Sequence, residues 1–501
     1  MTDVPGRFLL IGLAALVWFT ALARGAQDLW AVSVLCGWLS LLTWTFVYAR
    51  YKDHQRIVLP LARPLTALFL GILISSRYSF DIGTTRLEIT GLACGLISFF
   101  LFCNLFQDRT TRKKILSYAG SVTFPLAAIA ALQYFRDAPS LGSELRLLGS
   151  VSRSHWNAPS IFTNSALLAG FSLSWILLAW HHRKEGLYYQ WLFATCALNL
   201  FLARSWWAYI SLPVGFMYYY KYMDKNVPAK RFRSLVLLAP LTLFVLALLA
   251  KFGPGRDPLY TADARLGWWI AGIRMFLAHP WVGVGLGAYG TAFPFFKPLV
   301  AQNTLYAHSF PVQIISEIGL IGLVGILLLV GISWRQLSAQ NPSTREDQAY
   351  RATLLMLLTF SVATLFTDYF IAKLMLLLVL ALAVSSSPFE RYSISASGVR
   401  WAAVILIFLI PSWYLPFHSS QYDVWGLKYE LDGKSAEAET SFRKALALNP
   451  YEDDSCRGLS RLYRNRYVER RSVLDLSASL MWVRDAYRLK KVPPSYSEKT
   501  K

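Results

Sequence analysis

Long apolar runs recur along this 501-residue chain, and they restrict its fold more than any other feature. Runs of about 17–25 apolar residues have the length that an α-helix needs to cross the hydrocarbon layer of a bilayer. Charged residues make up only 16% of the chain, which is low for a soluble protein. We therefore expect an all-α, polytopic membrane protein with about 12–13 transmembrane helices. The predicted spans lie near residues 8–23, 29–49, 57–75, 88–106, 115–134, 160–180, 187–203, 205–220, 234–250, 309–333, 352–367, 370–386 and 401–417.

The net charge of +21 follows the loops between these runs. Lys and Arg cluster in alternate loops, which is the positive-inside pattern of membrane proteins. The charge therefore indicates topology and contact with anionic lipids, and no nucleic-acid partner is expected. The pattern predicts a cytoplasmic N-terminus, and thirteen spans then place the C-terminus outside. The basic loops are residues 50–56, 107–114, 181–186, 220–233 and 334–351.

The five cysteines predict neither a metal site nor a disulfide. No C-x-x-C pair is present, and Cys36, Cys94, Cys103 and Cys196 fall within predicted spans, where small apolar side chains are common. We expect no metal and no cofactor.

Two of the predicted outer loops are longer than turns, residues 135–159 and 251–308. In the second loop, residues 264–278 have the apolar spacing of an amphipathic helix that lies at the membrane interface. Pro280 ends this helix, and we expect the following WVGVGLGAYG to form a flexible turn. No strand precedes these glycines, so they do not predict a nucleotide-binding fold.

The composition changes after residue 417, which divides the chain into a membrane domain, 1–417, and a more highly charged tail, 418–501. Residues 419–452 match the spacing of a tetratricopeptide repeat, and a second copy fades soon after it begins. Fewer than three repeats do not bury a core alone. The tail is therefore expected to lean on the membrane domain, on a partner protein, or on a helix at 473–489.

Several charged residues are predicted at the outer membrane boundary, where charge is costly and often functional. Asp368 and Lys373 are placed to pair with each other. The arginines have two interpretations: side chains that extend to the interface, or ligands of an anion such as a diphosphate, which the planar guanidinium binds through two hydrogen bonds. The arginines are Arg153, Arg204, Arg265 and Arg274.

The segment AHSFPVQIISEIGLIGL, residues 307–323, brings a histidine and a glutamate to the same boundary. Pro311 belongs in a first helical turn, so a helix begins near Ser309, with His308 just before it and an amino end that favours an anion. Ser309, Gln313 and Glu317 form one polar stripe along this helix. His308 is either an interfacial capping residue or a general base for a hydroxyl group. Glu317 either bonds a neighbouring helix or orients the local network.

The blocks RLGWWIAGIRMFLAHPWVGVGLGAYGTAF (265–293) and AHSFPVQIISEIGLIGLVG (307–325) resemble the signature of the O-antigen ligase/polymerase superfamily. The shared elements are an arginine followed by aromatics, a glycine-rich turn, a His-Ser pair, and E-x-G-x-x-G. The resemblance extends more loosely to residues 203–215 and 160–171, and it covers most of residues 1–400.

This resemblance implies a metal-independent glycosyltransferase of the GT-C type in the bacterial cytoplasmic membrane, with its large loop in the periplasm. The implied donor is a glycan on undecaprenyl diphosphate, bound by Arg204 and Arg265, and His308 is the base that activates an acceptor hydroxyl for inverting attack. Supporting roles are expected for Glu317, Ser309, Arg274, Arg153 and Asn164. Ser205-Trp206-Trp207 and Thr163-Asn164 depart from the family pattern.

The sequence leaves the acceptor open. A lipid acceptor corresponds to a lipopolysaccharide ligase, a growing glycan to an O-antigen or exopolysaccharide polymerase, and a protein to an O-oligosaccharyltransferase. A transporter of lipid-linked glycans is the non-enzyme alternative, and it predicts inverted repeats that the sequence does not display. A scaffold that recruits a protein partner through 418–501 is compatible with the enzyme.

Overall fold

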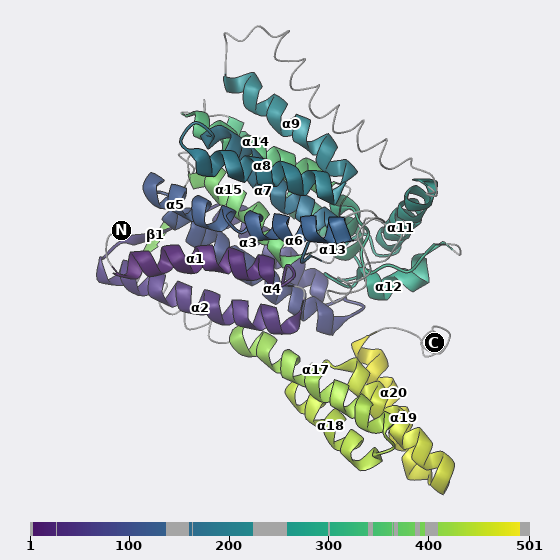
Figure 1. Ribbon diagram of the computed structural model, residues 1–501. Helices are drawn as coiled ribbons and strands as arrows, with labels where there is room; N and C mark the ends of the chain where they lie inside the picture. The colour runs from purple at the N-terminus through teal and green to yellow at the C-terminus, as the bar shows by residue number, and fades with distance from the viewer. Residues whose placement is uncertain are drawn as a thin grey trace.

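The computed structural model describes residues 4–26, 28–136, 160–162, 164–223, 258–298, 301–338, 344–362, 364, 369–385, 391–395 and 409–490. Helices dominate this part of the chain and form a bundle that carries a helical tail (Figure 1). This confirms the all-α, polytopic membrane class. The bundle helices are α1 (Val4–Leu22), α2 (Leu29–Lys52), α3 (Ala62–Ser76), α4 (Ile82–Leu105), α5 (Arg109–Gly120), α6 (Thr123–Arg136), α7 (Ser165–His182), α8 (Leu187–Ala203), α9 (Trp206–Met223), α13 (Phe310–Ser338), α14 (Arg345–Ser361) and α15 (Phe370–Ser385).

Four segments in the described residues are long and apolar enough to cross a bilayer, and several shorter apolar helices pack with them. The long segments are Leu29–Lys52, Ile82–Leu105, Arg109–Gln133 and Phe310–Arg335, and the shorter helices are Gly6–Leu22, Ala62–Ser76, Leu187–Ala203 and Phe370–Ser385. The span expected at 234–250 lies outside the described residues, and so do residues 137–159 of the outer loop expected at 135–159.

The span expected at 57–75 is divided into a strand and a helix. Strand β1 (Arg56–Pro60) pairs antiparallel with β2 (Arg391–Ser395), and α3 begins only afterwards. The side chain of Asn104 serves as a further partner for β1, because its amide accepts from the Val58 N–H (2.9 Å) and donates to the Val58 carbonyl (2.8 Å). The β-branched Ile57 and Val58 favour the extended strand.

The span expected at 115–134 is also interrupted, between α5 and α6. Pro125 lacks the N–H that would reach the Ser121 carbonyl, so the helical hydrogen-bond ladder has a gap at this point. Both halves still fall within one apolar segment of membrane-spanning length, Arg109–Gln133.

Basic loops that are far apart in sequence meet at one end of the bundle. Lys113 pairs with Glu185 across two of these loops (3.0 Å), and Arg109 pairs with Glu346 of a third (3.0 Å). The N-terminus lies at this same end, on the left in Figure 1. Three of the basic loops seen in the sequence therefore meet at this end of the bundle.

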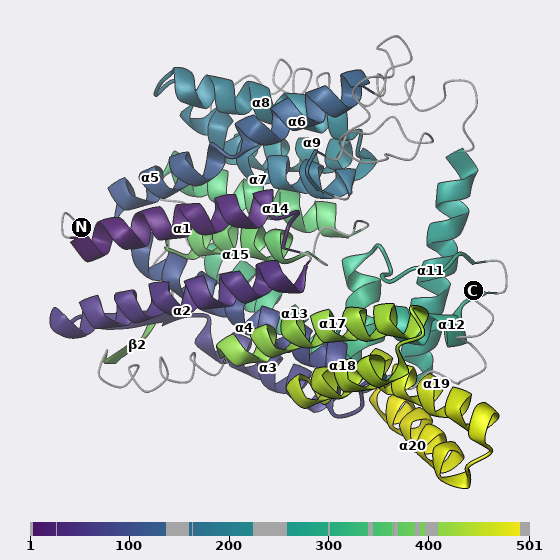
Figure 2. The same cartoon turned by 60° about the horizontal axis from the view of Figure 1, so that its bottom comes forward.

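The opposite end holds α11 (Pro258–Ala278), α12 (Tyr289–Phe296) and the tail (Figure 2). α11 includes the expected interfacial helix at 264–278 and begins earlier. Leu266 and Ile273 are exposed on it while Ala271 and Met275 are buried, so one apolar face is left without protein contact.

The tail consists of two helical hairpins, and α17 runs without a break across residues 417 and 418. Its first hairpin packs α17 on α18 around Phe442, and Gly426 lies so close that an added Cβ would stand 2.6 Å from the Phe442 ring. α17 also packs along α2 of the membrane bundle. The tail therefore contacts both the membrane domain and the helix expected at 473–489. Its helices are α17 (Leu409–Leu431), α18 (Ser435–Leu448), α19 (Asp453–Arg470) and α20 (Val473–Leu489).

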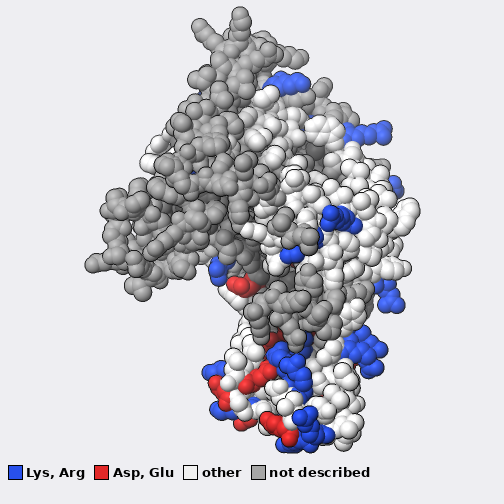
Figure 3. All heavy atoms as spheres, turned by 90° about the vertical axis from the view of Figure 1, so that its right-hand side faces the viewer, with Lys and Arg blue, Asp and Glu red and all other residues white. Residues whose placement is uncertain are grey.

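The surface chemistry of the two parts differs. In Figure 3 acidic and basic side chains crowd together on the tail, whereas the visible surface of the bundle above it is mostly uncharged. This contrast is what a lipid-facing bundle and a water-exposed tail require, because charged side chains are costly in hydrocarbon.

Candidate active site

His308 lies in the segment that leads from α12 to α13, and its ring stacks on Trp268 of α11. The ring centroids are 4.3 Å apart and the planes are inclined by 22°. His308 has a φ of 54°, in the left-handed region that non-glycine residues adopt only when their surroundings hold them there. The Trp268 indole N–H donates to the Gln302 carbonyl (3.1 Å), so Trp268 attaches the loop to α11 at two places, Gln302 and His308.

Arg265 lies one helical turn before Trp268 on the same face of α11, and its charge acts on His308. Burial and the nearby Arg265 guanidinium lower the pKa of His308 from 6.5 to about 4. Burial also lowers the pKa of Arg265, and arginine side chains in proteins stay protonated. The structure therefore brings a neutral imidazole and a guanidinium cation together.

The polar stripe on α13 fixes the loop that carries His308. Gln313 is central to it: its amide oxygen accepts from the Ala307 N–H (2.6 Å) and its amide N–H donates to the Glu317 carboxylate (2.6 Å). Ser309 donates from its hydroxyl to the Val362 carbonyl (2.7 Å) and so ties the helix start to the end of α14. Gln313 thus binds the backbone just before His308, and Ser309 ties the residue just after it to α14.

Helix α13 is broken two residues after Glu317, at Gly319, where φ is 59° and ψ is −157°. Such a break leaves two carbonyls and two amides without partners in the helix. The turn at 280–285 supplies all four partners at 2.8–3.2 Å. The bonds run from the amides of Val284 and Gly285 to the carbonyls of Ser316 and Glu317, and from the amides of Leu320 and Ile321 to the carbonyls of Pro280 and Trp281.

The glycine-rich turn is thus packed against backbone rather than flexible, which corrects the expectation from its composition. A Cβ on Gly283 would stand 2.3 Å from the Glu317 backbone, and one on Gly285 would stand 2.3 Å from the Ser79 hydroxyl. Both glycines also have positive φ. The residues are glycines because two backbones meet here with no room for a side chain.

Glu317 is fully enclosed at this junction, with 3% of its surface exposed. Besides Gln313, its carboxylate accepts from the N–H of Tyr289 at the start of α12 (3.3 Å). The Tyr289 hydroxyl in turn donates to the Trp268 carbonyl on α11 (2.6 Å). The carboxylate therefore joins α13 to α12 and, through Tyr289, to the helix that carries Arg265.

Arg204 lies at a separate junction, between α8 and α9. It is the C-cap residue of α8 with φ of 48°, and its N–H donates to the Leu200 carbonyl (3.2 Å). The Tyr209 hydroxyl donates to the same carbonyl across the break (3.1 Å). The described contacts thus bring Arg265 to His308, and they place Arg204 on another pair of helices.

The remaining predicted site residues have structural contacts or lie outside the described chain. Asn164 is the N-cap of α7, where its side chain accepts from the Ala166 N–H (2.8 Å). Arg274 is exposed and donates to the Phe296 carbonyl (3.3 Å). Arg153 and Asp368 lie outside the described residues. Lys373 forms an ion pair with Glu88 (2.6 Å), which the sequence did not predict.

The part of the chain that builds this site matches the O-antigen ligase family over residues 191–327. The match supports the O-antigen ligase superfamily for this part of the chain. Among curated proteins, no match to the chain was found. The matched range holds Arg204, Arg265 and His308, and it ends before the tail. The ligase family comprises membrane enzymes of the ligase or polymerase type, which act on lipid-linked glycans and acceptors in a bilayer.

Two residues of the ligase-family domain were missed by sequence reasoning. Trp268 covers the His308 ring, and Tyr289 links Glu317 to α11. For Trp268 a signal was present, because a spacing of three residues from Arg265 places both on one face of a helix. Tyr289 had no such signal, since its partners come from two other helices.

Proposed function

We propose that this protein transfers a glycan from an undecaprenyl-diphosphate carrier to an acceptor hydroxyl on the outer side of the cytoplasmic membrane. The observation that carries the proposal is the neutral His308 held beside Arg265 within the O-antigen ligase family domain. A neutral imidazole accepts a proton, and an adjacent guanidinium binds phosphate oxygens.

In the proposed reaction, a ring nitrogen of His308 takes the proton of the acceptor hydroxyl. The acceptor oxygen forms a bond to the anomeric carbon from the face opposite the diphosphate, while the bond from that carbon to the diphosphate oxygen breaks. Arg265 and Arg204 are the proposed ligands of the diphosphate, which leaves with the bonding electron pair. The configuration at the anomeric carbon is inverted, and no metal takes part.

Donor binding also supplies a reason for the low pKa of His308. A diphosphate beside Arg265 offsets the guanidinium charge, so the pKa of the imidazole rises once donor is bound. The base then becomes stronger only when the donor is in place, which disfavours unproductive protonation of the empty site.

The orientation of the site follows from the basic loops at the other end of the bundle. Loops rich in Lys and Arg remain on the cytoplasmic side. We therefore place the N-terminus inside the cell, and α11, α12 and the tail outside it.

The test is transfer from a lipid-linked oligosaccharide by the purified protein in proteoliposomes, with lipid, glycan and protein acceptors assayed separately. We expect His308→Ala and Arg265→Ala to lower transfer by about 100-fold or more, the range typical of a lost general base or charge-stabilising group. His54→Ala, an exposed histidine at the opposite end, is the matched control and should transfer like wild type. Wild-type transfer by His308→Ala would refute the proposal.

A further inference from the structure

Asp81 is the point where the tail, the bundle and the outer loop meet. It precedes α4, where its carboxylate accepts from the Thr84 N–H (2.9 Å) and caps the helix. The other carboxylate oxygen accepts from the hydroxyl of Thr291 in α12 (3.0 Å). The same oxygen lies 3.7 Å from the Lys490 ammonium at the end of the tail. One buried side chain therefore contacts three separate parts of the chain.

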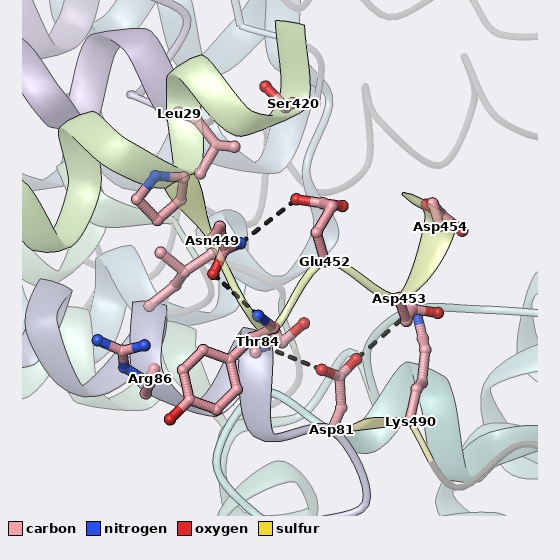
Figure 4. Close-up of a pocket in the computed structure, with 14 residues that line it drawn as sticks. Leu29, Asp81, Thr84, Arg86, Ser420, Asn449, Glu452, Asp453, Asp454 and Lys490 are labelled. Atoms are coloured by element: carbon pink, nitrogen blue, oxygen red, sulfur yellow. Dashed lines mark hydrogen bonds and ion pairs between the residues drawn. The ribbon is translucent and has the colours of Figure 1, made fainter. Parts of the chain in front are cut away.

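The tail is attached to the start of α4 by further contacts of different kinds. The backbones of Asp81 and Lys490 form an antiparallel bridge, and Lys490 also pairs with Asp453 at the start of α19 (3.8 Å). The Arg86 guanidinium lies over the Tyr451 ring, 4.5 Å from its centre. Figure 4 shows these residues converging from α4, from the turn before α19 and from the end of α20.

A cavity of about 210 Å³ lies beside these contacts, between α4 and the tail (Figure 4). Its lining includes Asp81, Arg86 and Lys490, together with Glu452 and Asp454 of the tail. The tail at this place is thus attached by a few polar contacts around a space, rather than by a packed apolar core. Removing one of these contacts should therefore loosen the tail at this place, while α17 stays packed along α2.

The start of α4 also forms hydrogen bonds with the glycine-rich turn that pairs with the broken backbone of α13. The Phe80 N–H donates to the Val284 carbonyl (2.8 Å), and the Thr85 hydroxyl donates to the Leu286 carbonyl (2.6 Å). The Ser79 hydroxyl accepts a hydrogen bond from the Asp81 N–H (2.9 Å) and lies against Gly285. A continuous set of contacts therefore leads from Lys490 through Asp81 to the turn, and from the turn to the broken helix below His308.

We propose that Asp81 is a positioning residue through which the docked tail holds α12 and the glycine-rich turn in the geometry that the transfer site requires. The tail is then a part of the catalytic unit rather than a removable recruiting module. The expected effect on catalysis rests on the proposed function. The docking of the tail can be measured without any assay of activity.

That readout is hydrogen–deuterium exchange of the full-length protein in detergent or nanodiscs. In Lys490→Ala and in Asp81→Asn, we expect faster exchange in peptides covering residues 283–296, because the turn and α12 lose one anchor. Lys490→Arg keeps the charge and should restore slow exchange. Lys434→Ala, an exposed lysine at the α17–α18 turn, is the matched control and should leave residues 283–296 unchanged.

Kinetics supply the second readout. We expect Lys490→Ala and Asp81→Asn each to lower kcat for glycan transfer by about 2- to 10-fold, with little change in the KM for the donor, since a 3.7 Å ion pair with a partly exposed lysine is weak. The double variant should lose no more than the larger single effect, because both residues act through one contact.

Unchanged exchange at 283–296 in both single variants would overturn the positioning role, and so would fully additive losses in the double variant. Failure of the proposed function is a different result: transfer would then survive His308→Ala, whatever the exchange of residues 283–296.

Discussion

At the scale of single residues, the environment of His308 sets the protonation state of its imidazole. An exposed imidazole would be partly protonated near neutral pH. Here burial and the adjacent Arg265 keep it neutral, with a pKa of about 4. The stack on Trp268 and the Gln313 amide hold its position.

Arg265→Gln should raise the pKa of His308, because it removes the cation that disfavours protonation. Burial is the larger cause and remains, so the pKa should move from about 4 toward 6.5 without reaching it. The measurement is the pH dependence of diethyl pyrocarbonate modification of the peptide containing His308, since only the neutral ring reacts. Arg274→Gln, also on α11 but exposed, should leave the midpoint in place. A midpoint that stays constant or falls in Arg265→Gln would contradict the assigned cause.

At the scale of elements, the break in α13 explains why a glycine-rich turn and a transmembrane helix belong to one site. A continuous helix would satisfy its own backbone and leave no place for the turn. The break exposes four polar backbone groups, and the turn supplies their partners from outside the helix. Within a membrane such groups need partners, because unsatisfied backbone is costly in hydrocarbon.

Gly319→Ala should destabilise the protein strongly. The backbone conformation at Gly319 is one that alanine rarely adopts, and an added Cβ would stand 2.6 Å from the Trp281 carbonyl group. We expect a loss of folded yield, or a lower Tm together with transfer reduced at least in proportion to the folded fraction.

Gly331→Ala is the matched control in the same helix, because an added Cβ there meets nothing within 4 Å. Alanine at this position should be neutral or stabilise by about 0.5–1 kcal/mol. Thermal unfolding in detergent compares the two variants, and equal Tm values would argue against a required break at Gly319.

At the scale of the whole molecule, the chain separates its basic end from the end that carries the site and the tail. The separation is visible in the contacts between basic loops and in the grouping of α11, α12 and α20 at the other end (Figures 1 and 2). The proposed transfer on the outer side of the membrane is compatible with this arrangement, because it places His308 and Arg265 at the end opposite the basic loops.

Single cysteines should therefore be labelled from opposite sides of the membrane. In a cysteine-free background, Leu305→Cys and Lys434→Cys should react with an impermeant thiol reagent on intact spheroplasts. Lys184→Cys should react only after permeabilisation. All three positions are exposed. Labelling of Lys184→Cys from the outside would reverse the proposed orientation.

The sequence by itself determined the helical membrane class and the boundaries of several helices, and it singled out His308 and Arg265 as candidate site residues. Helix α8 occupies residues 187–203 and α20 residues 473–489, both as predicted. Such features depend on local periodicity and on the length of apolar runs, which are visible in one stretch of chain. His308 and Arg265 were recognisable because their chemistry and spacing needed no distant partner.

Only the tertiary structure decided how these residues are held. The break at Gly319 is stabilised by a turn that lies more than thirty residues earlier, Asn104 completes the edge of β1, and Lys490 reaches Asp81 across most of the chain. Each case joins a backbone group or charge to a partner from a remote segment. Local sequence patterns do not record such partners, because a buried polar group is satisfied by whatever the fold brings beside it.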